Sequence, residues 1–391
     1  GNWRGNEQVG RTAGAGIIRI CGDVEMRVKL EDVCERGSSN LRQSDVEGKN
    51  GDYPIYGASG YIGNVDFYHQ ESSYVAVVKD GAGIGRTTLL PAKSSVIGTM
   101  QYLLPKKDVL PEYLYYVVRH MHLEKYFSGA TIPHIYFRDY KNEEFNIEPV
   151  ERQSEIVSVL RKLETVISTR QKQLQKLDDL VKARFVEMFV ATDAASDWPY
   201  CTIADVSNDM RTGPFGSALH HDEFIDSGVF VLGIDNAVEN KFSYNRMRYI
   251  TAEKYQELKR YTVYPGDVII TIMGTVGRSA VIPADMPKAI NTKHLACITP
   301  NAKMVNAQFL SCAFQVHPDI RAQLQKQCKG AIMDGLNLTI IKGLSFHIPP
   351  INLQDRFVGF YEQVDKSKAA VQKALDETQL LFDSLMQQYL A

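Results

Sequence analysis

The sequence predicts two tandem, mixed α/β modules, each followed by a long helix, with the two helices paired as an antiparallel coiled coil. Three observations support this fold class. The chain has 391 residues, which is too long for one ordinary domain. Its two halves share a spaced pattern of identical residues, and each half ends in a stretch whose apolar residues recur every seven positions.

The composition is typical of a soluble globular protein. Hydrophobic residues make up 44% and charged residues 23% of the chain, and no apolar run approaches the roughly 18 residues of a membrane span. The formal net charge of −2 argues against a protein that coats nucleic acid indiscriminately, although local basic faces are compatible with it. Six cysteines lie far apart without C-x-x-C spacing, so we expect reduced thiols in a cytoplasmic protein.

The first element is an extension over residues 1–25. It is rich in glycine and arginine, has no amphipathic period, and lacks the apolar core of a signal peptide. We expect this extension to be poorly structured, and Met26 is a candidate natural start.

The first module, residues 26–150, recurs as the second module, residues 198–350. The string K-x-x-x-F-x-I-x-P-x-x-x-Q begins at Lys141 and again at Lys342, 201 residues later. Upstream, Ile84-Gly85-Arg86 corresponds to Val276-Gly277-Arg278 at an offset of 192. Both copies of the upstream motif follow a β-rich run. The change in offset is what loops of different length in a duplicated domain would produce.

Each module leads into a long helix, expected over residues 151–190 and 351–391. The apolar period of seven is typical of coiled coils, and forty residues would form a rod of about 60 Å. Lys368 interrupts the second stripe, and the alternative is that each helix packs only on its own module. The stripes consist of Leu160, Ile167, Leu174, Val181 and Met188 with Leu163 and Leu177, and of Tyr361, Leu375, Phe382 and Tyr389 with Val364, Val371 and Leu385.

A small, polar linker, residues 191–197, separates the first helix from the second module. The order is therefore module, helix, module, helix. If a pseudo-two-fold axis relates the repeats, the helices run antiparallel and hold the modules at opposite ends. Such a protein suits duplex DNA, which has local dyads of its own.

This organisation resembles the specificity (S) subunits of type I restriction–modification systems. The string G-P-F-G-S-x-L at Gly213 to Leu219 is similar to one near the start of their target recognition domains, and so is the G-x-x-G-R turn at Gly274 to Arg278. The first module departs from the pattern, because Cys34 to Ser39 stand where a G-P-F-G-S string would be expected.

The resemblance implies that each target recognition domain reads one half of an interrupted site in double-stranded DNA. It also implies that the helices act as a ruler and dock two methyltransferase (M) subunits, with restriction (R) subunits joining the complex. S-adenosylmethionine, and ATP with Mg²⁺ for restriction, would then be bound by those partners and not by this chain.

The sequence carries no recognisable catalytic motif, so we expect a non-catalytic subunit without a metal site. The glycines from Gly81 to Gly85 lack the following helix of a nucleotide-binding fingerprint and indicate a tight turn between strands. Pro349-Pro350 lacks the acid or amide and the aromatic ring of an adenine methyltransferase motif, and no G-x-x-x-x-G-K-[ST] loop is present. The paired histidines, His120 with His122 and His220 with His221, lack companion ligands at metal spacing.

The duplication separates candidate phosphate contacts from candidate base readers. Charged residues shared by both modules, Arg86 with Arg278 and Lys141 with Lys342, are candidates for the uniform phosphate backbone. The alternative is that they are solvated or helix-capping charges.

Candidate base readers differ between the modules but lie beside the matched positions. Their side chains suit base edges or stacking, although aromatic residues in loops more often serve core packing. They are Tyr56, Ser59, Tyr61, Thr131, His134, Tyr136 and Arg138 in the first module, and Arg211, Phe215, Ser217, Asn236, Lys293, His294, Met333 and Asn337 in the second.

Other functions are compatible with parts of this pattern. A type IIB-like enzyme, in which one partner chain both cuts and methylates, would use the same kind of specificity subunit. A scaffold with two ligand-binding modules on a coiled coil would bind no DNA selectively. The missing motifs disfavour a self-sufficient enzyme, and the sequence does not identify the bases that would be read.

Overall fold

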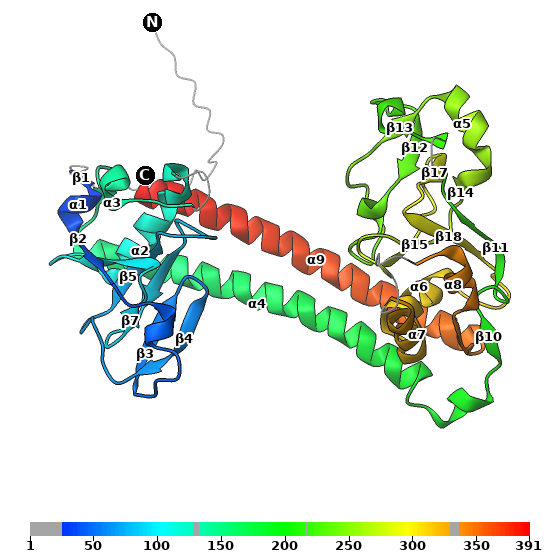
Figure 1. Ribbon diagram of the computed structural model, residues 1–391, viewed down its shortest axis with the longest axis horizontal. Coiled ribbons are helices and arrows are strands. Elements are labelled where there is room, and N and C mark those ends of the chain that lie inside the picture. The colour runs from blue at the N-terminus through cyan, green and yellow to red at the C-terminus, as the bar shows by residue number, and fades with distance from the viewer. Residues whose placement is uncertain (1–25, 129–132, 216–217, 329–335) are drawn as a thin grey trace, which may run out of the picture. The chain divides into compact units, whose positions relative to one another are not determined.

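The computed structural model describes residues 26–128, 133–215, 218–328 and 336–391, so the expected extension over residues 1–25 lies outside it. The chain divides into two compact units (Figure 1). Unit 1 runs as far as Ser168 and also contains Asp376–Ala391, whereas unit 2 is the continuous segment Thr169–Leu375.

The main sheet of unit 1 has the strand order β2-β8-β5-β6, with every pairing antiparallel. These strands are β2 (Cys34–Ser38), β8 (Met100–Pro105), β5 (Tyr74–Val78) and β6 (Thr87–Leu90). All five side chains of β5 are buried, which agrees with its unbroken apolar sequence and its central place.

Two smaller sheets complete the strands of unit 1. One has the order β4-β3-β7, in which β3 and β7 run parallel, and the other pairs β1 with β9 antiparallel. Their bounds are β1 (Met26–Lys29), β3 (Tyr53–Gly57), β4 (Gly60–Val65), β7 (Ser95–Val96) and β9 (Glu144–Ile147).

The helices of unit 1 are short except for α2 and the two long helices. The proline that opens α2 suits a first helical position, where no backbone N–H is needed. The helices are α1 (Leu30–Val33), α2 (Pro111–His120), α3 (Phe137–Tyr140) and the start of α4 (Val150–Phe189), with 3-10 turns η1 (Gln43–Asp45) and η2 (Leu123–Tyr126).

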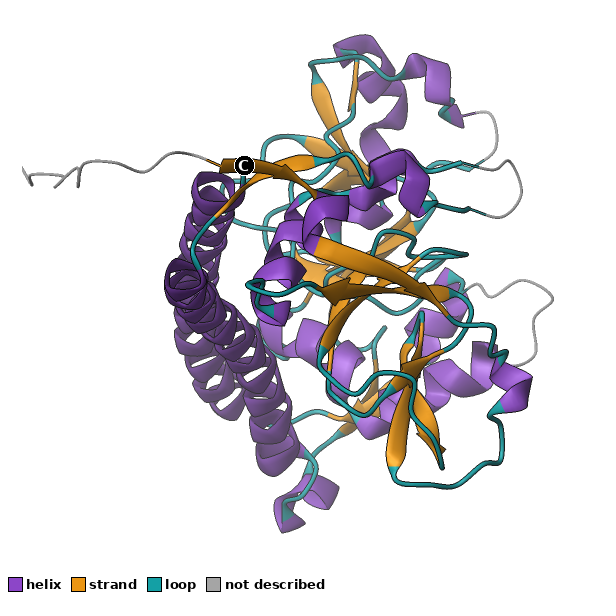
Figure 2. Cartoon of the chain, turned by 90° about the vertical axis from the view of Figure 1, so that its left-hand side faces the viewer, coloured by secondary structure: helices purple, strands orange, loops and turns teal. Residues whose placement is uncertain are grey.

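The core of unit 1 joins the main sheet to both long helices through α2. Val75 and Val77 of β5 pack in one cluster with Leu114 and Val117 of α2 and with the start of α4. The end of α9 (Ile351–Leu390) contributes its own residues to the same cluster, so the two helices cover one side of the unit (Figure 2). These α9 residues are Phe382, Met386 and Leu390.

The strands of unit 2 repeat this arrangement. Its main sheet has the order β11-β18-β15-β16, a second sheet has the order β13-β12-β17-β14, and β10 pairs with β19. The bounds are β10 (Tyr200–Thr202), β11 (Ser207–Thr212), β12 (Val229–Leu232), β13 (Tyr249–Ile250), β14 (Thr262–Val263), β15 (Val268–Thr271), β16 (Ser279–Val281), β17 (Ala289–Asn291), β18 (Leu295–Pro300) and β19 (Ser345–His347).

The helices of unit 2 enclose an aromatic core. The ring of Phe185 in α4 stacks on Phe309 at 5.5 Å and meets Phe357 of α9 edge-on at 5.3 Å. The helices are α5 (Ala252–Leu258), α6 (Ala307–Val316), α7 (Pro318–Cys328) and α8 (Leu338–Gly343), with 3-10 turns η3 (Asp193–Asp197), η5 (His221–Glu223), η6 (Ile234–Asn236) and η7 (Lys259–Tyr261).

The strand orders show that the repeat predicted from sequence is a duplicated fold. In both main sheets the first strand along the chain pairs with the last strand of the sheet, and a β-hairpin forms the other edge. In both smaller sheets one antiparallel and one parallel pairing recur, β3 with β4 and β7, and β12 with β13 and β17. Unit 2 also contains β14 and α5, which lie in its longer connections.

The duplicated glutamine holds the start of each long helix. Gln153 is fully buried, accepts from the backbone N–H of Leu110, and donates to the carbonyls of Asp108 and Glu148 at 2.8–3.0 Å. Gln354 makes the corresponding three bonds, to Asn306 N–H and to the carbonyls of Met304 and Pro349. Each copy of the shared string thus supplies a glutamine that joins the start of a long helix to the N-cap residue of α2 or α6.

The two long helices pair antiparallel in both units, which confirms the predicted coiled coil. In unit 1 the start of α4 packs beside the end of α9, and in unit 2 the end of α4 packs beside the start of α9. Each residue of the two predicted stripes is buried or half-buried. Lys368, which interrupts the apolar stripe, forms an ion pair with Asp178 of α4. The helices therefore pack on each other as well as on the modules.

The observed helix bounds, Val150–Phe189 and Ile351–Leu390, lie within one residue of those expected. Across the described ranges, no helix is long and apolar enough to span a membrane. Cys34, Cys201, Cys297 and Cys312 are free thiols, and burial raises the pKa of Cys34 and of Cys312 to about 12. Cys21 and the side chain of Cys328 lie outside what the structure describes.

Candidate nucleic-acid interface

A hairpin loop between two strands of the main sheet forms the centre of the candidate site in each module. In the first module Gly85 N–H donates to the Val78 carbonyl and Val78 N–H to the Arg86 carbonyl, both at 2.9 Å. In the second, Gly277 and Thr271 make the same exchange, with Arg278 in the place of Arg86. Gly85 and Gly277 have φ values of 80° and 82°, which favour glycine. The glycine-rich string is thus a turn between strands, as the sequence predicts.

Two further segments are fastened to each hairpin loop by matching backbone hydrogen bonds. Ile135 N–H donates to the Lys79 carbonyl at 3.0 Å, and Leu336 N–H donates to the Ile272 carbonyl at 2.9 Å. Lys79 N–H in turn donates to Thr99, and Ile272 N–H donates to His294.

The smaller sheet supplies a fourth segment in each module. Ile97 N–H donates to the Tyr56 carbonyl at 2.9 Å, and Thr292 N–H donates to the Leu232 carbonyl at 3.0 Å. We call the four segments together the loop end of a module. The loop ends are residues 56–61, 79–86, 97–99 and 133–138 in the first module, and 232–236, 272–278, 292–294 and 336–337 in the second.

The first loop end gathers three of the predicted readers. His134 bonds Asp80 through Nδ1 at 2.6 Å, and its ring stacks on Tyr136 with centroids 6.2 Å apart. The guanidinium of Arg138 lies over the ring of Tyr136, 4.6 Å from its centroid. These side chains are exposed or half-exposed, so they offer both hydrogen-bonding groups and a stacking surface.

The neighbouring β3–β4 turn carries the other predicted residues of this loop end. Ser59 is exposed at the turn, and Tyr61 is exposed with its hydroxyl donating to Asn64. Tyr56 is half-buried, and burial raises its pKa. Arg86 is exposed and donates to the Ala58 carbonyl at 3.1 Å, which ties the hairpin loop to this turn while leaving the guanidinium at the surface.

The second loop end presents a cationic surface. Arg278 and Lys293 are exposed, and His294 is half-buried beside them in the same loop end. Burial lowers the pKa of His294, and the charges of Lys293 and Arg248 lower it further, so its neutral form is favoured. Asn337 accepts from Ile340 N–H as the N-cap of α8, so its side chain is engaged in holding the helix.

Sequence comparison identifies the family to which these duplicated modules belong. Residues 23–179 and 195–378 match the family described as the type I restriction modification DNA specificity domain. The chain belongs to this family. Its two matched regions coincide with the two copies of the repeat, so it carries two specificity domains.

Two curated relatives are specificity subunits of type I restriction enzymes. The EcoBI subunit of Escherichia coli is 21% identical over 289 residues, which cover 68% of this chain and 60% of the relative. The MjaVIII subunit of Methanocaldococcus jannaschii is 22% identical over 214 residues, 51% of this chain and 49% of the relative. The chain thus matches only about half to three fifths of the length of these relatives.

Solved structures show that the fold is shared over nearly the whole chain. The type I restriction–modification S subunit of M. genitalium has a TM-score of 0.58 at 14% identity, covering 94% of this chain and 96% of its own. A chain from a study of complex assembly and conformational transition in the type I system has a TM-score of 0.56 at 13% identity, covering 93% and 97%.

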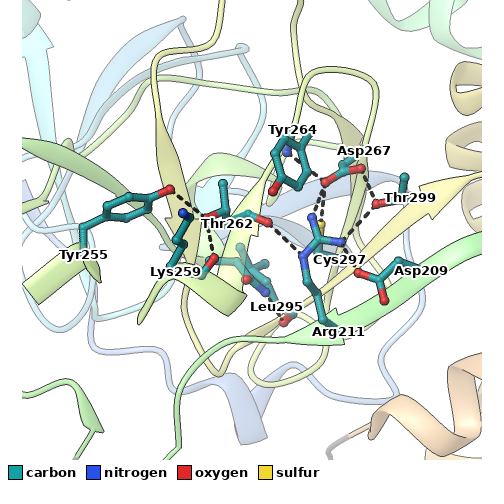
Figure 3. A network of polar contacts seen from close by, with 11 residues as sticks. Asp209, Arg211, Tyr255, Lys259, Thr262, Tyr264, Asp267, Leu295, Cys297 and Thr299 are labelled. Carbon is teal, nitrogen blue, oxygen red and sulfur yellow. Dashed lines mark hydrogen bonds and ion pairs between the residues drawn. The ribbon is translucent and has the colours of Figure 1, made fainter. Parts of the chain in front are cut away.

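Two predicted readers of the second specificity domain have structural roles instead. Arg211 has only 12% of its side chain exposed and pairs with Asp267, which is 1% exposed, and with Asp209 (Figure 3). Its Nε and one further N–H donate to the Thr262 carbonyl and to Thr299. Because this buried network engages all three nitrogens of the guanidinium, the prediction that Arg211 reads a base is wrong for this conformation.

Asn236 is likewise withdrawn from the surface. Its side chain is fully buried, its oxygen accepts from Gly233 N–H at 2.8 Å, and its amide donates to the Ser243 and Asn245 carbonyls. It shapes the turn at the end of β12, so its predicted role as a reader is also wrong in this structure.

The shared lysines differ in their surroundings. Lys141 pairs with Glu31 at 2.6 Å, whereas Lys342 is exposed. Their backbones act alike, because the Lys141 carbonyl accepts from Glu31 N–H and the Lys342 carbonyl from Ala204 N–H. The recurrence of lysine is therefore accompanied by a shared turn, and a phosphate contact at either lysine stays a prediction.

Phe215 is exposed at the end of the β11 loop. This loop passes so close to β17 that a Cβ on Gly213 would lie 2.2 Å from the Asn291 carbonyl oxygen, which accounts for the glycine of the G-P-F-G-S string. Three other predicted residues, Thr131, Ser217 and Met333, lie outside the described residues.

Sequence reasoning missed two charged residues of this region. Asp80 lies two residues beyond the end of the buried strand β5 and pairs with His134. Arg248 pairs with Asp235 beside Gly233. The position of Asp80, six residues before the recurring Arg86, was visible in the sequence. Its partnership with His134 was not, because 54 residues separate the two.

Proposed function

We propose that this chain is the DNA sequence-recognition subunit of a type I restriction–modification complex, reading a bipartite, interrupted site through its two specificity domains. The observation that carries the proposal is that both loop ends are built on the same backbone hydrogen bonds but present different side chains. A shared frame with exchanged side chains is what two modules need if they approach the same phosphate backbone and read different bases.

In this proposal the shared, exposed Arg86 and Arg278 contact phosphates and orient each domain. Base edges are read by the side chains that differ, His134, Tyr136 and Arg138 in one domain and Lys293 and His294 in the other.

The chemistry belongs to partner chains. Two methyltransferase subunits dock on the protein and flip an adenine out of each half-site for transfer from S-adenosylmethionine. Restriction subunits add ATP- and Mg²⁺-dependent cleavage when the site carries no methyl group. The chain itself supplies recognition and the docking surface, and it binds none of these cofactors.

Sequencing the methylated bases of cells that carry this chain with the methyltransferase encoded beside it tests the proposal. We expect modification at two short sequences separated by a gap of fixed length. Modification at one continuous sequence, or none that depends on this chain, would contradict it.

The long helices are proposed to fix the gap between the half-sites. Arg170 of α4 donates to the Ala374 carbonyl of α9, so these residues face each other across the seam. Inserting seven residues after Gln171 and seven after Ala374 preserves the heptad on both helices. At about 1.5 Å per residue the pair lengthens by roughly 10 Å, or about three base pairs of DNA.

We therefore expect the gap in the modified sequence to grow by about three base pairs with both half-sites unchanged. An insertion of seven residues after Ala194, in the linker, leaves the helices unaltered and serves as the control. If the variant with lengthened helices still modifies DNA at the original spacing, the proposal that the helices fix the gap is wrong.

A further inference from the structure

The first loop end contains an acidic side chain where a DNA-binding surface is normally basic. Asp80 lies at the start of the hairpin loop and is about one-third exposed (33%), as is its partner His134 (36%). A carboxylate repels phosphates and only accepts hydrogen bonds. Its presence among the predicted readers therefore needs an explanation other than phosphate binding.

The backbone already holds this pair in place. Asp80 and His134 face each other in an isolated antiparallel bridge, flanked by bonds from Gly81 N–H to Pro133 and from Ile135 N–H to Lys79. The hydrogen bond between the two side chains is thus not required to join the two segments. It fixes the direction of the carboxylate instead.

The pair is specific to the first domain. Because Ile135 and Leu336 make the same bond to their hairpin loops, Lys79 corresponds to Ile272 and Asp80 to Met273. Met273 is half-buried and packs against the core of unit 2. A carboxylate at this point of the loop end is therefore a difference between the domains and not a part of the shared frame.

We propose that Asp80 reads the exocyclic amino group of a cytosine or an adenine in the half-site of the first domain, with His134 as its positioning residue. Nδ1 of His134 donates to Oδ1 of Asp80 at 2.6 Å, and the imidazole ring is itself supported by stacking on Tyr136. Oδ2 forms an ion pair with Lys79, whose Nζ lies 3.9 Å away, beyond hydrogen-bonding distance. That oxygen is the acceptor offered to the N4 amine of cytosine or the N6 amine of adenine in the major groove.

This inference rests on the proposed function, and its test separates the two. The chain, assembled with its methyltransferase partner, selects binding sites from a DNA library in which both half-sites are randomised. If the unaltered complex selects no bipartite sequence, the proposed function fails. If the unaltered complex does select a bipartite sequence, the base preference of the Asp80→Asn complex is compared with that of the unaltered complex at each position.

We expect Asp80→Asn to reduce discrimination on the order of ten-fold at one position of one half-site, where the unaltered protein selects a cytosine or an adenine on one strand. The base selected there decides between the two amines. Asp80→Glu, which keeps the carboxylate, retains part of the preference. His134→Phe keeps a ring to stack on Tyr136 but lacks the Nδ1–H, and it weakens discrimination at the position that Asp80 reads, as well as at any base that His134 contacts itself.

Asp66→Asn is the matched control, because it removes an exposed carboxylate at the opposite end of β4 from the loop end. The other half-site serves as an internal control for folding and assembly. An unchanged preference at every position in Asp80→Asn would overturn the proposal. So would an even loss of binding across all sequences with the circular dichroism spectrum preserved, since that result would make Asp80 a support of the surface and not a reader.

Discussion

Gln153 and Gln354 each use both ends of a buried amide on the backbone, joining a long helix to the N-terminus of a shorter one. Truncation at either position would leave backbone groups without partners in the interior. A lost buried bond of this kind costs about 1–3 kcal/mol. Substituting each glutamine in turn therefore measures how much the stability of each repeat depends on this contact.

We expect Gln153→Ala and Gln354→Ala each to lower the free energy of unfolding by about 1–3 kcal/mol, whereas Gln171→Ala, at an exposed helix position, changes it little. Amide hydrogen exchange assigns the effect. Leu110 N–H should exchange faster in the first variant and Asn306 N–H in the second. Equal exchange at both amides in both variants would show that each glutamine does not act locally on its own helix start.

His317 makes the stability of unit 2 depend on pH. Its ring is buried against Phe346 and Phe185, and its Nδ1 accepts from Asp319 N–H. Burial lowers its pKa below the usual 6.5, His347 lowers it further, and Asp319 opposes both. On acidification the unfolded state takes up this proton first, so stability is lost as the pH falls below about 6.5.

We expect the free energy of unfolding to fall between pH 7 and pH 5.5, with His317 contributing at most about 1.4 kcal/mol per pH unit. The pKa values of His120 and His294 are lowered as well, mainly by burial, and act in the same direction. Denaturant titrations of His317→Gln across this range should show a shallower fall. A slope identical to that of the unaltered protein would contradict the assignment.

For single residues, the sequence predicted the role of those that recur in both modules better than the role of those found in only one module. Phe145 and Phe346, which the repeat paired, are both buried, because a shared core constrains both copies. Arg211 and Asn236 were chosen for their chemistry alone. Nothing in the sequence showed that Asp267, 56 residues from Arg211, would enclose its guanidinium.

The paired helices carry one polar contact where an apolar residue would complete the stripe. Lys368 and Asp178 are both partly exposed, with 32% and 45% of their side chains accessible, so their attraction is screened by water. We expect a double-mutant cycle with Lys368→Ala and Asp178→Ala to give a coupling below about 1 kcal/mol.

Lys368→Leu should match or exceed the stability of the unaltered protein, since leucine restores the stripe. Thermal unfolding of the variant, compared with Lys366→Leu at an exposed position of the same helix, measures the difference. A loss of more than about 2 kcal/mol in Lys368→Leu would show that the ion pair outweighs apolar packing at this point.

Helices and sheets differed in how far the sequence predicted them. The apolar heptads predicted the ends of both long helices to within one residue, because a seven-residue repeat is formed by residues that are close together in the sequence. Strand pairing is not local. β11 pairs with β18 and β12 runs parallel to β17, across connections that no short pattern records.

Across the whole molecule, the two domains should contribute independently to salt-dependent binding. Arg86 and Arg278 occupy the same point of the shared hairpin, one in each loop end. If each neutralises one phosphate, Arg86→Gln and Arg278→Gln should each reduce the slope of log affinity against log salt by about one, and the double variant by about two.

Binding of the assembled complex to its own site at several salt concentrations provides the slopes. Arg356→Gln, an exposed position on α9, is the control. Base preferences should not change in either variant. A variant that alters the selected sequence while leaving the slope unchanged would identify its arginine as a reader.

The division of unit 1 between two distant segments has a consequence for synthesis. Unit 2 is continuous and can fold as soon as it leaves the ribosome, whereas the core of unit 1 lacks Phe382, Met386 and Leu390 until translation has passed them. The segment that emerges first therefore completes its core last. During that interval the apolar surface that awaits α9 is open to solvent, so chaperones have most to protect in the half of the protein that is made earliest.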